Sequence, residues 1–95
     1  MLKILRLNES FILSGAWHGS VGKTFDVEYD EDKFFAERSF AYKHAYDGGK
    51  IPPGGDEGKV TYALRPKKIG FFTVTAVEAF RGEVKHKMKY KIIVL

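Results

Sequence analysis

The chain contains no cysteine, so disulfide bonds, thiolate metal ligands and cysteine nucleophiles are excluded. It also lacks any apolar run approaching the roughly 20 residues that a membrane-spanning helix needs. Its opening segment is interrupted by Lys3, Arg6 and Glu9 and lacks the continuous apolar core of a signal peptide. We therefore expect no membrane span and no export signal within this chain. The absence of cysteine permits a reducing compartment, and the localisation is left open.

The positive charge is concentrated in the C-terminal third. Residues 1–64 contain eight Lys/Arg and ten Asp/Glu, whereas residues 65–95 contain eight Lys/Arg and two Asp/Glu. Such a split is typical of a chain that binds an acidic partner or pairs its own halves. The hydrophobic content of 44% is too high for a disordered tail, so we expect a single domain over residues 1–95.

Apolar and polar residues alternate along much of the chain, which is the pattern of half-buried antiparallel strands. Glycine, proline or acidic clusters separate the alternating segments. These segments are LKILRL (2–7), TFDVEYD (24–30), KVTYALR (59–65), GFFTVTAVEAF (70–80) and EVKHKMKYKIIVL (83–95). The pattern predicts an all-β protein, an antiparallel β-sandwich of about seven strands.

The segment DKFFAERSFAYKHAY (32–46) is ambiguous. Asp32 is placed to cap a helix, and Phe34–Glu37 could form a short helical turn. The later aromatic residues alternate instead, and aromatic residues favour strands. We expect this segment to be mostly strand.

The segment WHGSVGKT (17–24) resembles the phosphate-binding loop G-x-x-x-x-G-K-[ST], except that Trp17 replaces the first glycine. That loop requires a following helix, whereas a strand pattern follows here. We therefore interpret the segment as the glycine-containing turn of a hairpin, with Trp17 in or beside the core.

No constellation of catalytic or metal-binding residues is evident. The acidic run 28–32 lacks the glycine and spacing of a calcium loop. The three histidines (His18, His44 and His86) are scattered, and we expect His86 to face inward on the last strand. The serines lack a nucleophile-elbow context. We expect no metal site, no cofactor and no enzymatic activity.

Two turns are the preferred candidates for contact with a partner. The segment DGGKIPPGGDEGK (47–59) is long for a hairpin connection, and long loops on a rigid scaffold often carry binding function. The second turn carries Arg81, a residue type common at interface hot spots. The predicted partner-binding residues are Gly54, Gly55, Asp56 and Arg81.

Four alternating lysines mark the last segment and form a predicted basic face: Lys85, Lys87, Lys89 and Lys91. Their spacing of about 7 Å along a strand is near that of phosphates in an extended nucleic acid. Binding to nucleic acid or another acidic polymer is therefore one alternative function. Lysine rows also protect edge strands from unwanted pairing, which favours a solvated face. Homodimerisation through an edge strand is a further alternative.

The C-terminal half resembles the last strands of immunoglobulin-like domains of bacterial and archaeal proteins. The likeness rests on the order VTYALRP, KKIG, FFTVTAVEAF and KYKIIVL over about residues 58–95. It implies an immunoglobulin-like sandwich that serves as a non-catalytic interaction module.

A narrower likeness is to the chagasin-type inhibitors of cysteine proteases. In that family a glycine-rich loop precedes a strand much as PPGGDEG precedes KVTYAL here, and three loops at one end enter the protease cleft. Gly54 and Gly55 match the glycine-rich loop, and Arg81 lies near the position of a third-loop arginine. The family's Asn-Pro-Thr-Thr-Gly loop has no counterpart in this sequence.

The sequence thus predicts a module that binds another protein through loops or sheet edges. Binding of nucleic acid through the basic face and inhibition of a cysteine protease are the two alternatives.

Overall fold

The computed structural model describes residues 1–42 and 57–95. Seven strands and one short 3-10 turn lie in these residues, which confirms the predicted number of strands. They are β1 (Leu2–Leu5), β2 (Phe11–His18), η1 (Gly19–Val21), β3 (Lys23–Glu28), β4 (Phe34–Tyr42), β5 (Glu57–Pro66), β6 (Gly70–Phe80) and β7 (Glu83–Val94). Within the described ranges, no helix is long and apolar enough to cross a membrane.

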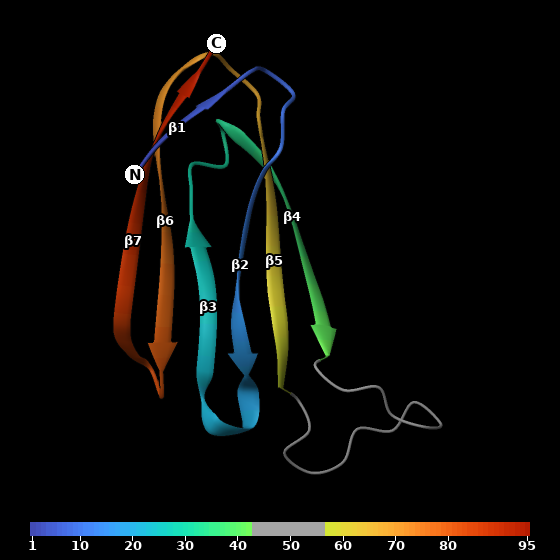
Figure 1. Cartoon of the computed structure of the whole chain (residues 1–95), viewed down its shortest axis with the longest axis vertical. Helices are drawn as coiled ribbons and strands as arrows, with labels where there is room; N and C mark the ends of the chain where they lie inside the picture. Colours follow the sequence, from blue (N-terminus) through green and yellow to red (C-terminus); the bar gives the residue numbers. More distant parts are fainter. Residues whose placement is uncertain (43–56) are drawn as a thin grey trace.

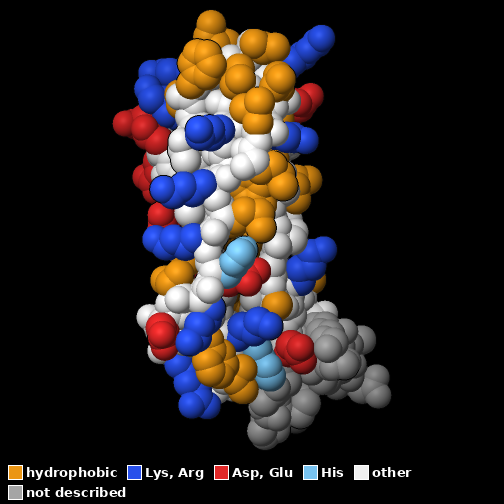
Figure 2. Space-filling view, turned by 60° about the vertical axis from the view of Figure 1, so that its left-hand side comes forward, with side chains coloured by type: hydrophobic (Ala, Val, Ile, Leu, Met, Phe, Trp, Pro, Cys, Tyr) orange, Lys and Arg blue, Asp and Glu red, His pale blue; other side chains and the backbone are white. Residues whose placement is uncertain are grey.

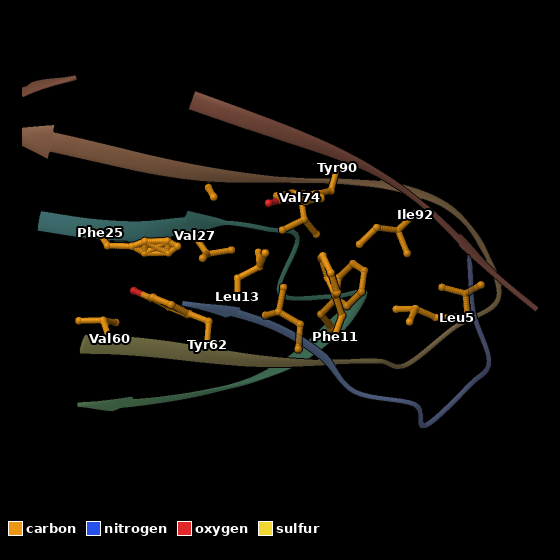
Figure 3. Packing of buried hydrophobic residues seen from close by; sticks show 14 residues of the cluster. Leu5, Phe11, Leu13, Phe25, Val27, Val60, Tyr62, Val74, Tyr90 and Ile92 are labelled. Carbon is orange, nitrogen blue, oxygen red and sulfur yellow. The ribbon is translucent and has the colours of Figure 1, made fainter. Parts of the chain in front are cut away.

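The strands form one sheet in the order β1-β7-β6-β3-β2-β5-β4 (Figure 1). The sheet folds over on itself between β3 and β2 (Figure 3). These two strands are paired at His18 and Lys23 next to their connecting turn. Side chains from the layer β7–β6–β3 meet those from the layer β2–β5–β4 (Figure 3). The predicted all-β sandwich is therefore confirmed. The first strand departs from the antiparallel pattern, because β1 pairs in parallel with the end of β7.

The core takes one side of most strands, as the alternation predicts, whereas β6 is buried on both sides from Val74 to Val77. Burying an aliphatic or aromatic side chain in this way stabilises the fold by about 1.5–3 kcal/mol. Phe11 packs edge-on against Tyr90, with ring centroids 5.3 Å apart, and so joins the two layers. The buried cluster includes Leu5, Phe11, Leu13, Phe25, Val27, Phe34, Val60, Tyr62, Leu64, Val74, Tyr90, Ile92 and Val94 (Figure 3).

Strand β2 was not predicted, although it lies in the middle of the sheet order. Its inward positions run Phe11, Leu13, Gly15 and Trp17, and the glycine interrupts the apolar alternation. The structure supplies the reason for that glycine. A Cβ atom on Gly15 would lie 2.3 Å from the ring of Phe25, so no larger residue fits without movement.

The expectations for the segment from Asp32 need correction. Phe34–Glu37 belongs to β4 and forms no helical turn. Asp32 caps no helix; its own N–H donates to the Oδ1 of Asp30, at 2.9 Å, in a turn before the strand. The Asp30 carbonyl accepts from the N–H groups of Lys33 and Phe34, which closes that turn. Residues 43–46 lie outside the described residues.

The expectation that every second residue of the last strand faces the core is half right. Tyr90, Ile92 and Val94 are buried, whereas Val84, His86 and Met88 are exposed. His86 lies on the inner side of the strand, as predicted, but it is exposed, so the prediction that it forms part of the core edge is wrong. The strand register shifts between Glu78 and Ala79 of β6, opposite this exposed half of β7.

Candidate protein-binding site

Two tight turns lie side by side at the end of the sandwich opposite the chain termini (Figure 1). The β2–β3 turn contains η1 and ends at Gly22, whose φ of 78° is readily adopted by glycine. The β6–β7 turn contains Arg81 and Gly82. The N–H of Arg81 donates to the carbonyl of Gly22 at 2.8 Å and ties the two turns together. We call this end of the molecule the loop end.

The third connection also leaves from the loop end. In the sheet register His18 lies opposite Glu57, and Tyr42 lies opposite Gly58. Strand β4 therefore ends, and β5 begins, beside the β2–β3 turn. The residues that join them, 43–56, include the predicted contact residues Gly54, Gly55 and Asp56, which lie outside the described residues. All three connections thus start and finish at one end of the sandwich.

Arg81 lies in the turn, as the sequence predicts, and its role in binding stays a prediction. Its φ of 52° is unusual for a residue with a side chain. The guanidinium lies over the ring of Phe80, with 5.2 Å between Cζ and the ring centroid. This contact holds a flexible cation near the tip and restricts the directions in which it can reach a partner.

Apolar surface accompanies the charge at the loop end. Val21 and Phe80 keep 40% and 39% of their surfaces exposed. A hollow of about 280 Å³ beside the turns is lined by residues that include Lys23, Glu78 and Phe80. Exposed apolar groups next to an arginine and a hollow are typical of a protein-binding surface. The likeness of WHGSVGKT to a phosphate-binding loop concealed the place of the β2–β3 turn beside Arg81. The signal that could have found it is the glycine pair Gly19 and Gly22.

The interpretation of WHGSVGKT as a hairpin turn is confirmed, because strand β3 follows directly and no helix begins there. Trp17 packs against the core, and Arg38 lies over its ring, with 5.1 Å from Cζ to the centroid. The acidic segment 28–32 ends β3 and forms the turn at Asp30. Among the described residues, no three His, Asp or Glu side chains are grouped so that they could hold a metal ion.

The basic face is exposed, but its charges are mixed with carboxylates (Figure 2). In the sheet register Asp26 lies in the same row as Lys87, with β6 between them, and Glu28 lies in the same row as Lys89. The Nζ of Lys85 lies 3.2 Å from the Oε2 of Glu83. The aromatic residue among the lysines, Tyr90, is buried and cannot stack on bases. This mixture favours a solvated surface over a continuous phosphate-binding surface.

One partly buried hydroxyl, that of Tyr62, has a raised pKa. Burial raises the pKa of Tyr62, and the nearby Asp26 carboxylate adds to this, while Arg38 opposes it. The Tyr62 hydroxyl donates to Oδ1 of Asp26 at 3.3 Å. The contact links the two layers, since Tyr62 belongs to β5 and Asp26 to β3. We interpret the Tyr62–Asp26 hydrogen bond as structural because it lies away from the loop end.

No protein-family model and no curated protein sequence match this chain. Solved structures match it by fold. One is the crystal structure of the cysteine protease inhibitor EhICP2 from Entamoeba histolytica, with a TM-score of 0.77 at 16% identity over 99% of this chain and 86% of that one. Another is the solution structure of amebosin, with a TM-score of 0.69 at 13% identity over 99% and 88% of the two chains.

At these identities the likeness establishes a shared fold. The expected resemblance to cysteine protease inhibitors is supported at that level. The bacterial or archaeal type of immunoglobulin-like domain stays a prediction.

Proposed function

We propose that this protein binds another protein through its loop end, and that the partner is a papain-like cysteine protease whose cleft the loops enter. The observation that carries the proposal is the 2.8 Å hydrogen bond from the Arg81 N–H to the Gly22 carbonyl. It holds two turns as one tip, next to the strand ends from which the third connection leaves. The resemblance to chagasin-type inhibitors implies the same use of three loops at one end.

The construction of the tip suits inhibition. Association costs less when the contacting backbone is already ordered, and both turns are fixed by backbone hydrogen bonds and by the strands on either side. Exposed Val21 and Phe80 offer apolar area, and Arg81 offers a cation beside them. Such a tip can fill a cleft without any reactive group of its own. The shared fold with EhICP2 adds support, because that protein is a cysteine protease inhibitor.

An inhibition assay with papain tests the proposal. We expect the protein to inhibit hydrolysis of a small fluorogenic substrate reversibly and in competition with that substrate. A serine protease of similar size serves as the specificity control. If papain and related enzymes keep full activity at about 100 µM protein, which corresponds to a binding free energy weaker than about 5.5 kcal/mol, protease inhibition is excluded.

A matched pair of arginine variants locates the contact. Arg81 and Arg65 each lie over a neighbouring phenylalanine ring, at 5.2 Å from Phe80 and 5.4 Å from Phe35, but only Arg81 belongs to the loop end. We expect Arg81→Ala to weaken inhibition by about tenfold or more and Arg65→Ala to leave it unchanged. Equal effects of the two substitutions would contradict binding through the loop end.

A further inference from the structure

Strand β7 has a neighbour on both sides only along its C-terminal part. β6 pairs with the strand from Glu83 to Val94, whereas β1 pairs with Lys91–Val94. At the boundary the N-terminal amine donates to the Lys89 carbonyl at 3.2 Å, and the Lys91 N–H donates to the Met1 carbonyl at 2.8 Å. In residues 1–42 and 57–95, no strand pairs with the other side of β7 before this point.

The open edge presents backbone hydrogen-bonding groups. Because the Lys89 carbonyl and the Lys91 N–H face β1, and successive residues of a strand alternate in direction, the N–H and carbonyl of Lys87 face the open edge. The N–H of Lys89 faces it as well. An added strand would take up these groups, as in the recognition of extended peptides by sheet edges.

The side chains along this edge define what kind of strand would fit. Lys87 and Lys89 are exposed on the outer face of the sandwich. On the inner face lie His86 and Met88, and Met88 keeps 38% of its surface exposed. The complementary strand carries carboxylates on one face and apolar side chains on the other, at alternate positions.

Within the same sheet, an acidic strand already lies near these lysines, with β6 between it and β7. Strand β3 alternates acidic and apolar residues, and its Asp26 and Glu28 lie in the same rows as Lys87 and Lys89 across β6. A strand added on the other side of β7 would bring its carboxylates next to these lysines, at about 5 Å between Cβ atoms. The arrangement therefore fits an acidic strand better than an uncharged one.

We propose that an acidic extended segment of another protein adds to the sheet along His86–Tyr90 of β7. The lysines would select this partner in two ways. They attract carboxylates on the adjacent strand, and they disfavour pairing of two copies, in which lysine rows would face each other. The irregularity opposite Lys85 ends the regular edge and limits the docking stretch to these residues. This surface is separate from the loop end, so the proposal does not rest on protease inhibition.

A synthetic peptide with the sequence of residues 24–30, TFDVEYD, is a suitable probe because it has the required alternation. The protein is used without an N-terminal tag, because the N-terminal amine itself donates to the Lys89 carbonyl at this edge. We expect binding by fluorescence polarisation, with the largest amide chemical-shift changes at Lys87–Lys89. A peptide with Asn and Gln in place of Asp and Glu should bind about tenfold more weakly. A peptide N-methylated on its backbone should lose binding, because it cannot complete the ladder.

The double variant Lys87→Glu/Lys89→Glu should weaken binding of the acidic peptide by about tenfold or more. The matched control Lys59→Glu/Lys68→Glu makes the same change of charge elsewhere on the surface and should stay within about twofold of the unmodified protein. Binding that survives the first variant, or shift changes away from β7, would overturn the proposal. So would a dimer that occupies this edge, or single-stranded DNA that shifts the same amides more strongly than the peptide.

Discussion

The two halves of β7 share one sequence pattern but lie in different environments. Ile92 is 1% exposed and Val94 is 3% exposed, whereas Val84 is 49% exposed and Met88 is 38% exposed. The buried half meets the opposite layer, where Phe11 packs on Tyr90. The exposed half lies beyond the reach of that layer and has an open edge. Alternation therefore predicts which way a side chain points, while the position of the opposite layer decides whether it is buried.

The largest expected change in the free energy of unfolding comes from comparing one substitution in each half of β7. Ile92→Ala removes a nearly fully buried side chain and leaves a cavity, so the free energy of unfolding should fall by about 2–4 kcal/mol. Met88→Ala removes a partly exposed side chain of similar size from the other half, whose sulfur accepts a hydrogen bond from the Tyr90 hydroxyl at 2.7 Å, and should cost about 1–2 kcal/mol. Urea denaturation followed by tryptophan fluorescence measures both values. Equal losses would show that the exposed half of β7 is as well packed as the buried half.

A second substitution tests whether loose packing is confined to β7 or extends across the loop end. Gly15 lies on β2 at the level of Phe25, and a Cβ atom there would lie 2.3 Å from the Phe25 ring. Phe25 is itself buried and packs edge-on against Tyr62, which limits its movement. We therefore expect Gly15→Ala to lower the free energy of unfolding by about 1–3 kcal/mol.

If Gly15→Ala is neutral in the same denaturation experiment, the ring of Phe25 moves freely. The layers near the loop end would then be loosely packed as a whole. Gly58→Ala provides no clean control, because a Cβ atom there would meet the Ala41 carbonyl oxygen at 2.3 Å.

The two halves of β7 also show how much of the fold the sequence predicts. The strands β3, β5, β6 and β7 and their inward faces follow from alternation, because each contributes a regular apolar side. Strand β2 escaped prediction because Gly15 breaks its apolar face, and the need for that glycine depends on Phe25, ten residues away in the chain. His86 was misplaced because its exposure depends on how far the opposite layer extends.

The candidate site also combines features that the local sequence predicts with features that depend on long-range strand pairing. Arg81 could be placed in a turn from the local sequence. Its partner across the tip, Gly22, is set by how β3 and β6 pair, and the sequence does not state that pairing. The predicted basic face is present, but the carboxylates in its rows come from β3, far away in the sequence. Local patterns thus predict elements, and long-range pairing decides which of them share a surface.

A smaller effect is expected in the turn that begins the exposed half of β7. Gly82 has a φ of 80°, and apart from Gly82 and its two chain neighbours no described residue has an atom within 4 Å of a Cβ placed there, so Gly82→Ala tests backbone strain. We expect a loss of about 1 kcal/mol. Arg81→Asn should have the opposite sign and stabilise by about 0.5 kcal/mol, because asparagine tolerates the φ of 52° better.

Thermal denaturation of the two variants checks these signs. A stable Arg81→Asn variant that no longer inhibits papain would separate the role of the side chain in binding from its effect on folding. Destabilisation by both substitutions would mean that the arginine side chain contributes more to the fold than its backbone strain costs.

The smallest expected effect lies at the partly buried contact between Tyr62 of β5 and Asp26 of β3. Burial raises the pKa of Tyr62 in the folded protein above its usual value of 10.0, so the unfolded chain loses this proton first as the pH rises. The stability that Tyr62 contributes should therefore be complete below about pH 10 and should decline as the pH rises toward the folded-state pKa. Comparing the unfolding free energies of the unmodified protein and Tyr62→Phe at each pH removes the effects of the other tyrosines and lysines. We expect their difference, which at neutral pH includes the hydrogen bond to Asp26, to shrink at alkaline pH as ionised Tyr62 faces the Asp26 carboxylate in a partly desolvated site. A constant difference would mean that water reaches this hydroxyl freely, and the interior near β3 would then be as open as the exposed half of β7.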